Sequence, residues 1–207
     1  MTIIGLTGGI ASGKSTASER LRELGALVVD ADLLGHRVYD PGTPGFEKIV
    51  NAFGHDLVAE DGSIDRRILG GKVFGAPEEM KRLTDIAWPE IRRMAGEEFA
   101  KLRKQDPNAV IVFEAAVLLE AGWQDLVDEV WVVTTKIETA IERLKSRNGL
   151  GREAAMARID SQMSNRQRLE FADVKIDNSE DEEKLRSRIE YHWKRLMKRI
   201  AEPTDKS

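Results

Sequence analysis

The stretch Gly8-Gly9-Ile10-Ala11-Ser12-Gly13-Lys14-Ser15 decides the fold, because it fits the pattern G-x-x-x-x-G-K-[S/T]. Glycines in such a loop let consecutive backbone N–H groups turn toward bound phosphates. The Lys14 ammonium would reach the β- and γ-phosphate oxygens, and the Ser15 hydroxyl would bind Mg²⁺. The sequence therefore predicts a site for ATP or another nucleoside triphosphate. The residues expected to bind the nucleotide are Gly9, Ile10, Ala11, Ser12, Gly13, Lys14, Ser15 and Thr16.

Apolar and amphipathic segments alternate on both sides of this loop. Short apolar runs predict strands at 3–6, 27–29, 110–113, 130–133 and 174–176. Helical patterns occupy 14–24, 32–38, 44–53, 65–74, 77–104, 137–148 and 151–168. Continuously apolar, β-branched strands suit a parallel sheet covered on both faces by helices. We therefore predict an α/β domain with the three-layer P-loop nucleoside triphosphate hydrolase fold, similar to nucleoside monophosphate kinases.

The C-terminal helix is marked by its own signals. Ser179 and Glu182 have the spacing of a capping box, and the first turn is acidic. An apolar stripe at helical spacing follows, formed by Leu185, Ile189, Trp193, Leu196 and Ile200. Only residues 202–207 are expected to fray.

Composition excludes several classes of protein. The 207 residues include 32 basic and 36 acidic ones, for a formal charge of −4. This near balance argues against a general nucleic-acid or membrane-surface binder, which would carry a basic excess. The chain has no cysteine, so disulfides, thiol nucleophiles and Cys-ligated zinc are excluded. Its three histidines lack the short spacing of metal ligands.

No segment predicts secretion or membrane insertion. Residues 1–4 lack the basic start of a secretory signal. The longest mostly apolar stretch, 110–123, contains two glutamates and is too short to span a bilayer. We therefore expect a cytoplasmic enzyme.

Two carboxylates follow the second predicted strand, in Asp30-Ala31-Asp32. Ligands on open α/β sheets bind beyond the carboxyl ends of the strands, so these side chains are candidates for engaging an acceptor hydroxyl or metal-bound water. An equally good explanation from position alone is that Asp32 caps the helix that follows. The guanine signature N-K-x-D of GTPases is absent, since residues 134–138 resemble it only loosely.

Residues 136–168 carry a local excess of positive charge, because they include eight Lys and Arg residues and four Asp and Glu residues. Gly149 and Gly151 provide a flexible joint between two helices, and Arg143 and Arg147 share one helix face. Most such arginines form ordinary solvated helix surface. One or two that fold over the phosphates would stabilise charge in the transition state.

These motifs together resemble the dephospho-coenzyme A kinase family. The similarity runs through residues 6–16, 24–25 and 29–32, and it reappears at residues 41–44, 53–54, 61–62, 65–66, 73–74, 118–120, 158–159, 162, 168 and 172–173. Residues 84–89 and 114–123 also resemble the kinase domain of the bifunctional coenzyme A synthases of animals. Because Met1 stands at the edge of the first strand, we expect no adenylyltransferase portion.

The resemblance implies transfer of the ATP γ-phosphoryl group to the ribose 3′-hydroxyl of dephospho-coenzyme A, the last step of coenzyme A biosynthesis. It places Asp32 at the acceptor hydroxyl, with Asp30 near the metal, directly or through water. It implies that Leu118, Leu119 and Glu120 line the acceptor pocket, that Arg143 and Arg147 are lid arginines, and that Asn178 contacts adenine. A turn role is the alternative for Asn178. The family pattern implies one domain over 1–207, with a helical acceptor-binding insert at about 35–105 and a lid at about 143–168.

Two other functions compete with this one. One is a different small-molecule kinase of the same architecture, such as a nucleoside monophosphate kinase. The other is a non-catalytic nucleotide-dependent switch, against which the intact Lys14, Ser15, Asp30 and Asp32 argue. We expect neither nucleic acid nor a membrane to be a partner of this protein.

Overall fold

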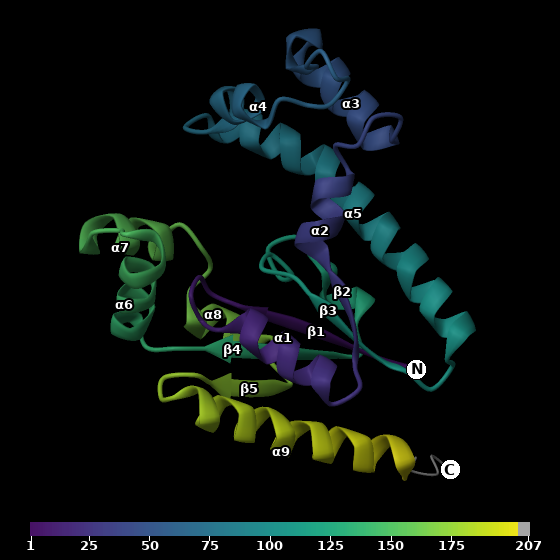
Figure 1. The fold of residues 1–207 in the computed structure, drawn as a ribbon, viewed down its shortest axis with the longest axis vertical. Coiled ribbons are helices and arrows are strands. Elements are labelled where there is room, and N and C mark those ends of the chain that lie inside the picture. Colours follow the sequence, from purple (N-terminus) through teal and green to yellow (C-terminus); the bar gives the residue numbers. More distant parts are fainter. Residues whose placement is uncertain (203–207) are drawn as a thin grey trace. The chain divides into compact units, whose positions relative to one another are not determined.

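The computed structural model describes residues 1–202 (Figure 1). The chain divides into two compact units, one made of residues 1–29 with the chain from 105 onward, and one made of residues 30–104. The second unit overlaps the helical insert expected at about 35–105. Of the segment expected to fray, residues 203–207 lie outside the described residues.

A five-stranded sheet forms the centre of the first unit, in the order β2-β3-β1-β4-β5. Its strands are β1 (Thr2–Gly8), β2 (Leu27–Asp30), β3 (Val110–Glu114), β4 (Glu129–Thr134) and β5 (Val174–Asp177). β1 pairs in parallel with both β3 and β4, and β4 pairs in parallel with β5. The predicted α/β class with a parallel sheet is confirmed, and all five strands begin within one residue of their predicted starts.

One face of the sheet carries the main hydrophobic core. Helices α1 (Lys14–Glu23) and α9 (Glu182–Ala201) pack here, in the lower part of Figure 1. Alternate strand residues point toward them, since side chains on a strand alternate between faces. We call this cluster the main core; its buried members include Ile4, Leu6, Leu21, Val112, Trp131, Val133, Ile176, Leu185, Ile189 and Leu196.

The opposite face is covered by the chain that follows β3. Gly5 lies so close to this segment that a Cβ atom there would stand 2.8 Å from Leu118 and 3.0 Å from Val127. A short 3-10 helix, η2 (Trp123–Leu126), packs its Trp123 ring against Phe113 of β3, with ring centroids 5.8 Å apart. Glycine at position 5 therefore lets the segment lie directly on the sheet.

Helices α6 (Ile137–Asn148) and α7 (Arg152–Asp160) form a hairpin with a small hydrophobic cluster of its own. The single helix expected at 151–168 is wrong, because α7 ends at Asp160 and a separate helix α8 (Asn165–Glu170) begins after Ser164. The Ser164 side chain accepts from the backbone N–H of Gln167, and the Gln167 side chain accepts from that of Ser164. This capping box starts a new helix and separates the two.

The start of α9 also differs from the prediction. Asp181 is the N-cap, and its carboxylate accepts from the Lys184 N–H at 2.8 Å. The Ser179 hydroxyl is engaged elsewhere, donating to Asp177 at 2.6 Å and accepting from the Lys136 N–H at 3.0 Å. The predicted apolar stripe is buried except at Ile200, which is 36% exposed near the helix end.

Residues 30–104 form a helical unit around its own core. Its helices are α2 (Ala31–Arg37), α3 (Pro44–Phe53), η1 (His55–Leu57), α4 (Arg66–Val73) and α5 (Pro77–Gln105, whose last residue belongs to the first unit). Thr43 caps α3, with Pro44 in its first turn. Buried apolar side chains fill the space between the helices, among them Leu34, Ile49, Phe53, Leu57, Leu69, Leu83 and Ile91.

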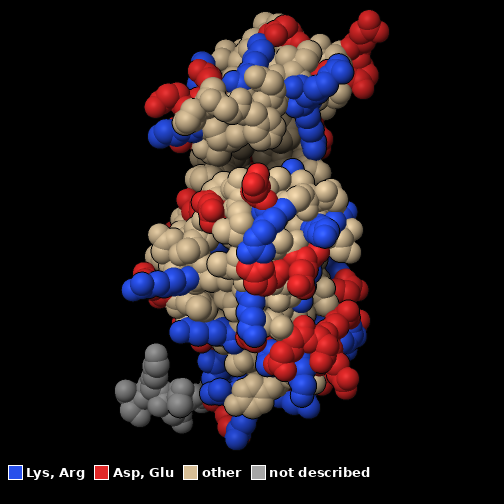
Figure 2. All heavy atoms as spheres, turned by 90° about the vertical axis from the view of Figure 1, so that its left-hand side faces the viewer, with Lys and Arg blue, Asp and Glu red and all other residues tan. Residues whose placement is uncertain are grey.

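Residues 1–202 offer neither a membrane-spanning helix nor a cluster of metal-binding side chains. None of their helices is long and apolar enough to cross a membrane. No group of three or more His, Cys, Asp or Glu side chains in this range could hold a metal ion. On the face drawn in Figure 2, acidic and basic side chains are interspersed.

Candidate nucleotide-binding site

The stretch 8–15 joins β1 directly to α1, as the sequence predicts. Its turn depends on two left-handed residues, Ala11 with φ 57° and Gly13 with φ 94°. Left-handed φ is uncommon for a residue with a side chain, so Ala11 is a strained position within the loop. A backbone hydrogen bond from Ser12 to Gly9, 3.1 Å long, closes the loop. We call residues 8–15 the phosphate loop.

Lys14 and Ser15 meet a carboxylate that the sequence analysis did not select. The Lys14 ammonium donates to Glu114 Oε1 at 2.8 Å, and the Ser15 hydroxyl donates to the same oxygen at 3.3 Å. Glu114 is the last residue of β3, and its side chain is 9% exposed. The neighbouring strands β1 and β3 thus bring an acid and a base together at the carboxyl edge of the sheet.

Burial of the Glu114 carboxyl favours its neutral form and on its own would raise its pKa. The hydrogen bond and positive charge of Lys14 outweigh burial, and hydroxyl contacts act in the same direction. The net pKa of Glu114 therefore lies below its usual value. Glu114 is a carboxylate at neutral pH, beside the loop's lysine and the hydroxyl expected to bind Mg²⁺.

Asn178 supports the phosphate loop from below. Its buried side chain donates to the Ser12 carbonyl at 2.7 Å, and its backbone N–H donates to the Thr134 carbonyl, also at 2.7 Å. A Cβ atom at position 13 would stand only 2.0 Å from the Asn178 Nδ2, so that position requires glycine. The adenine contact expected of Asn178 stays a prediction, while its amide is engaged with the loop itself.

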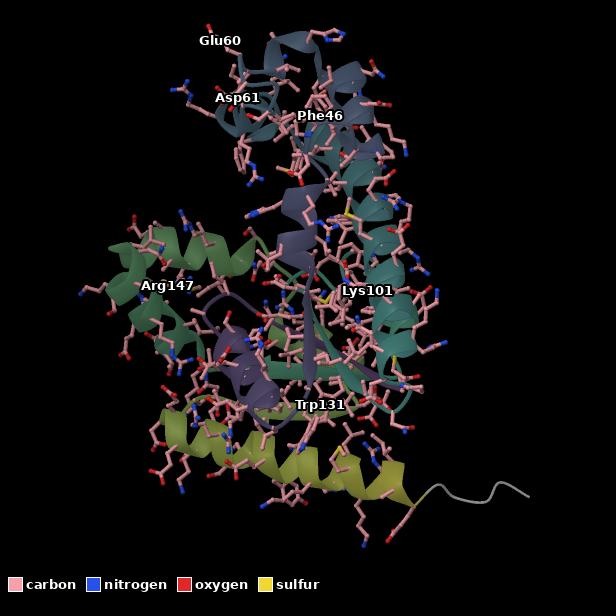
Figure 3. The ribbon with its side chains drawn as sticks, turned by 45° about the vertical axis from the view of Figure 1, so that its right-hand side comes forward. Phe46, Glu60, Asp61, Lys101, Trp131 and Arg147 are labelled. Carbon is pink, nitrogen blue, oxygen red and sulfur yellow. The ribbon has the colours of Figure 1, made fainter. Side chains whose placement is uncertain are left out.

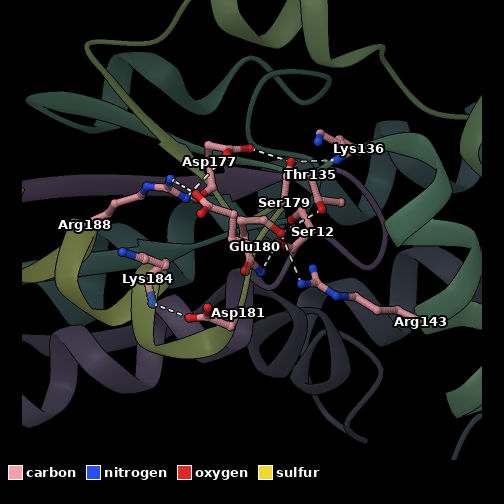
Figure 4. Close-up of polar contacts among 11 residues, drawn as sticks. Ser12, Thr135, Lys136, Arg143, Asp177, Ser179, Glu180, Asp181, Lys184 and Arg188 are labelled. Atoms are coloured by element: carbon pink, nitrogen blue, oxygen red, sulfur yellow. Dashed lines mark hydrogen bonds and ion pairs between the residues drawn. The ribbon is translucent and has the colours of Figure 1, made fainter.

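The two candidate lid arginines lie in different surroundings. Arg143, labelled in Figure 4, points toward the strand ends. It donates to the Ala11 carbonyl and to the Asn178 carbonyl, each at 3.1 Å, so it bridges the phosphate loop and the end of β5. Arg147 lies exposed at the C-terminal end of α6 (Figure 3) and donates to the Asn148 side chain at 3.2 Å. Only Arg143 contacts the phosphate loop in this structure.

A pocket of about 450 Å³ opens beside the loop, between it and the chain from Ile159 to Arg168. At its wall, the Gln162 side chain accepts from the Ile10 N–H at 2.9 Å. Arg168 is only 2% exposed, donates to the Met163 carbonyl, and pairs with Glu120 at 3.0 Å. A buried arginine with a carboxylate partner next to this loop is a further candidate group.

The acceptor segment expected at residues 118–120 has a mixed position. Leu118 is fully buried and Leu119 is 7% exposed. Glu120 is partly exposed and holds Arg168 through one carboxylate oxygen, while its buried second oxygen, Oε2, has no hydrogen-bond partner. The acceptor role expected of these three residues stays a prediction, and Leu118 packs on the sheet.

The structure assigns the capping role to Asp30 rather than Asp32. The Asp30 carboxylate accepts from the backbone N–H groups of Asp32 and Leu33, at 2.8 and 3.3 Å. Asp32 is an exposed residue in the first turn of α2. The alternative that Asp32 caps this helix is therefore wrong, and Asp30 is a cap whose metal role stays a prediction.

Comparison with known proteins gives this site a family. The family model for dephospho-CoA kinase matches residues 2–184. The chain is 46% identical to the dephospho-CoA kinase of Geobacter sulfurreducens, over 93% of this chain and 98% of the relative. It is 42% identical to that of Dehalococcoides mccartyi, over 92% and 95% of the two chains.

The chain belongs to the dephospho-CoA kinase family.

Solved structures agree with this assignment. Dephospho-CoA kinase from Campylobacter jejuni superposes with a TM-score of 0.72 at 31% identity, covering 95% of this chain and 97% of that one. Shikimate kinase from Acinetobacter baumannii has a TM-score of 0.52 at 16% identity, covering 96% and 94%, and shares the fold alone. The family assignment and the P-loop kinase fold predicted from the sequence are therefore confirmed. The narrower likeness to the bifunctional synthases of animals stays a prediction.

The dephospho-CoA kinase family implies ATP and Mg²⁺, and the donors at the loop fit both. Backbone N–H groups, an ammonium and a helix N-terminus suit phosphate oxygens. A hydroxyl beside a carboxylate offers the oxygen ligands that Mg²⁺ requires. Ser15 and Glu114 are the residues that would hold the Mg²⁺ ion, and the Glu114 carboxylate supplies negative charge close to the loop.

Proposed function

We propose that the protein transfers the γ-phosphoryl group of ATP to the ribose 3′-hydroxyl of dephospho-coenzyme A. The observation that carries the proposal is the Lys14–Glu114–Ser15 set at the phosphate loop, in a chain of the dephospho-CoA kinase family. The names of relatives that match more than nine-tenths of the chain support this acceptor over other small molecules.

On the donor side, each loop residue has a distinct task. Backbone N–H groups of residues 9–16 hold the phosphates, and the Lys14 ammonium leaves Glu114 to reach the β- and γ-phosphate oxygens. The Ser15 hydroxyl would hold Mg²⁺, which would supply positive charge to stabilise the phosphates. Glu114 stays ionised because its pKa is held below the usual value, so its carboxylate would hold the metal together with Ser15.

On the acceptor side, Asp32 accepts the proton of the attacking hydroxyl and orients its oxygen. The exposed position of Asp32 and the assignment of the capping role to Asp30 support this role. Glu120, with one oxygen on Arg168, is proposed to contact the acceptor, and Leu118 and Leu119 to shape the segment that carries it. Asp30 is retained as a candidate near the metal.

Arg143 and Arg147 complete the proposed catalytic set. Arg143 already contacts the Ala11 carbonyl, so a small movement of its guanidinium would bring it to phosphate oxygens bound in the loop. Arg147 is proposed to approach the transferred group when the lid segment, about 143–168, closes over it. We further propose that Asn178 lies near adenine, that the enzyme works in the cytoplasm, and that nucleic acid and membranes are not its partners.

An acceptor panel tests the function. Purified protein with ATP and Mg²⁺ is given dephospho-coenzyme A, AMP, CMP, UMP or dTMP, and ADP release is followed with a coupled assay. We expect turnover with dephospho-coenzyme A alone. Turnover only with a nucleoside monophosphate would favour the other kinase class, and no acceptor-dependent turnover would favour the switch.

The same assay tests Asp32. Asp32→Asn keeps the size of the side chain but removes its negative charge, so we expect loss of most turnover, with ATP affinity within a few fold of wild type. Asp40→Asn, an exposed aspartate of the same unit, is the matched control and should have wild-type kinetics. Retained turnover in Asp32→Asn would remove Asp32 from the mechanism.

A further inference from the structure

The hairpin of α6 and α7 has a hydrophobic cluster that we call the lid core. Its buried members are Ile141, Leu144 and Ala155, and the partly buried side chains packed against them are Ile10, Ala11, Leu150, Met156 and Ile159. Two of these residues, Ile10 and Ala11, come from the phosphate loop. The main core contains no residue of the hairpin.

A hairpin of this size needs such outside help. α6 has 12 residues and α7 has 9, lengths at which isolated helices are marginal in water. Three buried side chains, one of them an alanine, supply little burial to offset the entropy of ordering both helices. The apolar side chains at the loop's tip therefore contribute a substantial part of what orders the hairpin.

Polar contacts hold the same two loop residues from the lid side. Gln162, just beyond α7, accepts from the Ile10 N–H at 2.9 Å. Arg143, on α6, donates to the Ala11 carbonyl at 3.1 Å. The backbone of the dipeptide Ile10–Ala11 is thus contacted from the middle of α6 and from just beyond α7, and its side chains pack in the lid core.

The backbone of Ala11 makes this arrangement conditional. Its φ of 57° lies in the left-handed region, which a residue with a side chain occupies only when its surroundings hold it there. Here those surroundings are the lid core and Arg143. A change in the loop's conformation would therefore move Ile10 and Ala11 relative to the hairpin, and loosening of the hairpin would release the loop.

We propose that Ile10 and Ala11 are positioning residues that couple the conformation of the phosphate loop to the order of α6 and α7. Phosphates bound in the loop fix its backbone, and the two side chains pass that constraint to the hairpin. The lid is then ordered by nucleotide from beneath, through packing, in addition to any direct contact from Arg147. The coupling of loop and hairpin is independent of the reaction, and only its use in nucleotide binding rests on the proposed function.

Hydrogen–deuterium exchange of the nucleotide-free protein tests the coupling itself. Ile10→Ala removes apolar atoms from the lid core, so amides of 137–160 should exchange at least about fivefold faster, while those of α1 and α9 stay at wild-type rates. Ile200→Ala is the matched control, since it makes the same change outside the lid core. Ile10→Val should restore most of the protection. Wild-type exchange in 137–160 of Ile10→Ala would overturn the proposal.

Linkage supplies a second test that a merely structural role would fail. Coupling is reciprocal, so Met156→Ala, on α7, should weaken ADP binding by calorimetry about three- to tenfold. In an Ile10→Ala background the same substitution should change ADP affinity less than twofold, because the path is already broken. Equal effects in both backgrounds would overturn the proposal. Because the exchange experiment uses no nucleotide, a protein that failed to phosphorylate dephospho-coenzyme A would still test the coupling.

Discussion

The two parts of the phosphate loop are held by different regions of the protein. Its base, formed by Gly8, Ser12, Gly13 and Lys14, joins β1 to α1, two elements of the main core, and is supported by Asn178 and Glu114. Its tip, formed by Ile10 and Ala11, packs in the lid core. The main core draws on four strands and two helices, whereas the lid core has three buried side chains.

This difference lets the base of the phosphate loop stay rigid while its tip moves with the hairpin of α6 and α7. Atoms that must be placed accurately, the Lys14 ammonium and the backbone beside it, are attached to the part of the molecule that is most deeply packed. The tip is attached to a part whose packing is marginal, and local opening is least costly where few apolar groups are buried. One loop can therefore keep its charges in place while its tip follows the lid.

The largest effect is expected at the base. Lys14→Met keeps much of the side chain's volume but removes the charge that would stabilise the transferring phosphoryl group, so turnover should fall by about 10²–10³ or more. Because Glu114 is left buried without its cation, the free energy of unfolding should also fall, by about 3 kcal/mol. Stopped assays of ADP formation and urea denaturation measure the two effects.

A second substitution separates the effect of Lys14→Met on turnover from its effect on the free energy of unfolding. Glu114→Gln added to Lys14→Met removes the unpaired charge, so it should recover most of the lost stability and none of the lost turnover. A Lys14→Met protein within threefold of wild-type turnover would show that the base of the loop does not carry the charge chemistry.

The next effect compares the two cores by one substitution. Leu21 in the main core and Leu144 in the lid core are both fully buried. Leu21→Ala should lower the global free energy of unfolding by about 2–5 kcal/mol, the usual cost of a core cavity. Leu144→Ala should lower it by about 1 kcal/mol or less and instead speed amide exchange in 137–160, because that hairpin opens without global unfolding. Equal global losses would show that the two cores unfold together.

The pH dependence of the free energy of unfolding tests the role of Glu114 at the base of the phosphate loop. The pKa of Glu114 is lowered in the folded protein, so its contribution to stability is complete above the unfolded pKa of 4.5 and is lost as pH falls through the folded pKa. The difference in unfolding free energy between wild type and Glu114→Gln should therefore be constant near neutral pH and shrink below pH 4.5. Denaturant titrations at several pH values measure it, and a difference that grew on acidification would contradict the assigned direction.

The smallest effect is expected at a hydroxyl under the loop. Ser12 Oγ is buried and lacks a hydrogen-bond partner, so Ser12→Ala should leave the free energy of unfolding unchanged or raise it by up to about 1 kcal/mol. Thr135→Val is the paired variant, because the Thr135 hydroxyl donates to the Asn178 carbonyl at 2.8 Å and its loss should cost about 1 kcal/mol. Thermal denaturation of the two variants in parallel gives the comparison.

Local patterns were sufficient for much of the fold. The phosphate loop, the five strands and six of the seven helices in the predicted list lie where periodicity and glycine punctuation indicate, to within two residues. The break after Asp160 had a signal in the sequence, the Ser164-x-x-Gln167 capping box, which the polar helical pattern around it concealed. At α9, the predicted cap Ser179 is engaged instead by the Lys136 N–H, 43 residues away, and Asp181 caps the helix.

The candidate site was harder to predict than the fold, because the residues that pair in it are far apart in the sequence. Glu114 pairs with Lys14 across 100 residues, and only the order of the strands brings them together. A charged residue ending an otherwise apolar strand was the available signal. The participation of Ile10 and Ala11 in the lid core depends on tertiary packing and has no short-range signature.

The contact between Asn178 and Gly13 has a consequence for exchanging parts between related kinases. No side chain larger than hydrogen is tolerated at position 13 while the amide of residue 178 stands where it does. A chimera in which the segment from β5 onward comes from another kinase would therefore place a different residue against Gly13 of the phosphate loop. Such chimeras should fold when the donor protein supplies an asparagine or a smaller residue at position 178. The phosphate loop and the segment that contains residue 178 must therefore be exchanged together.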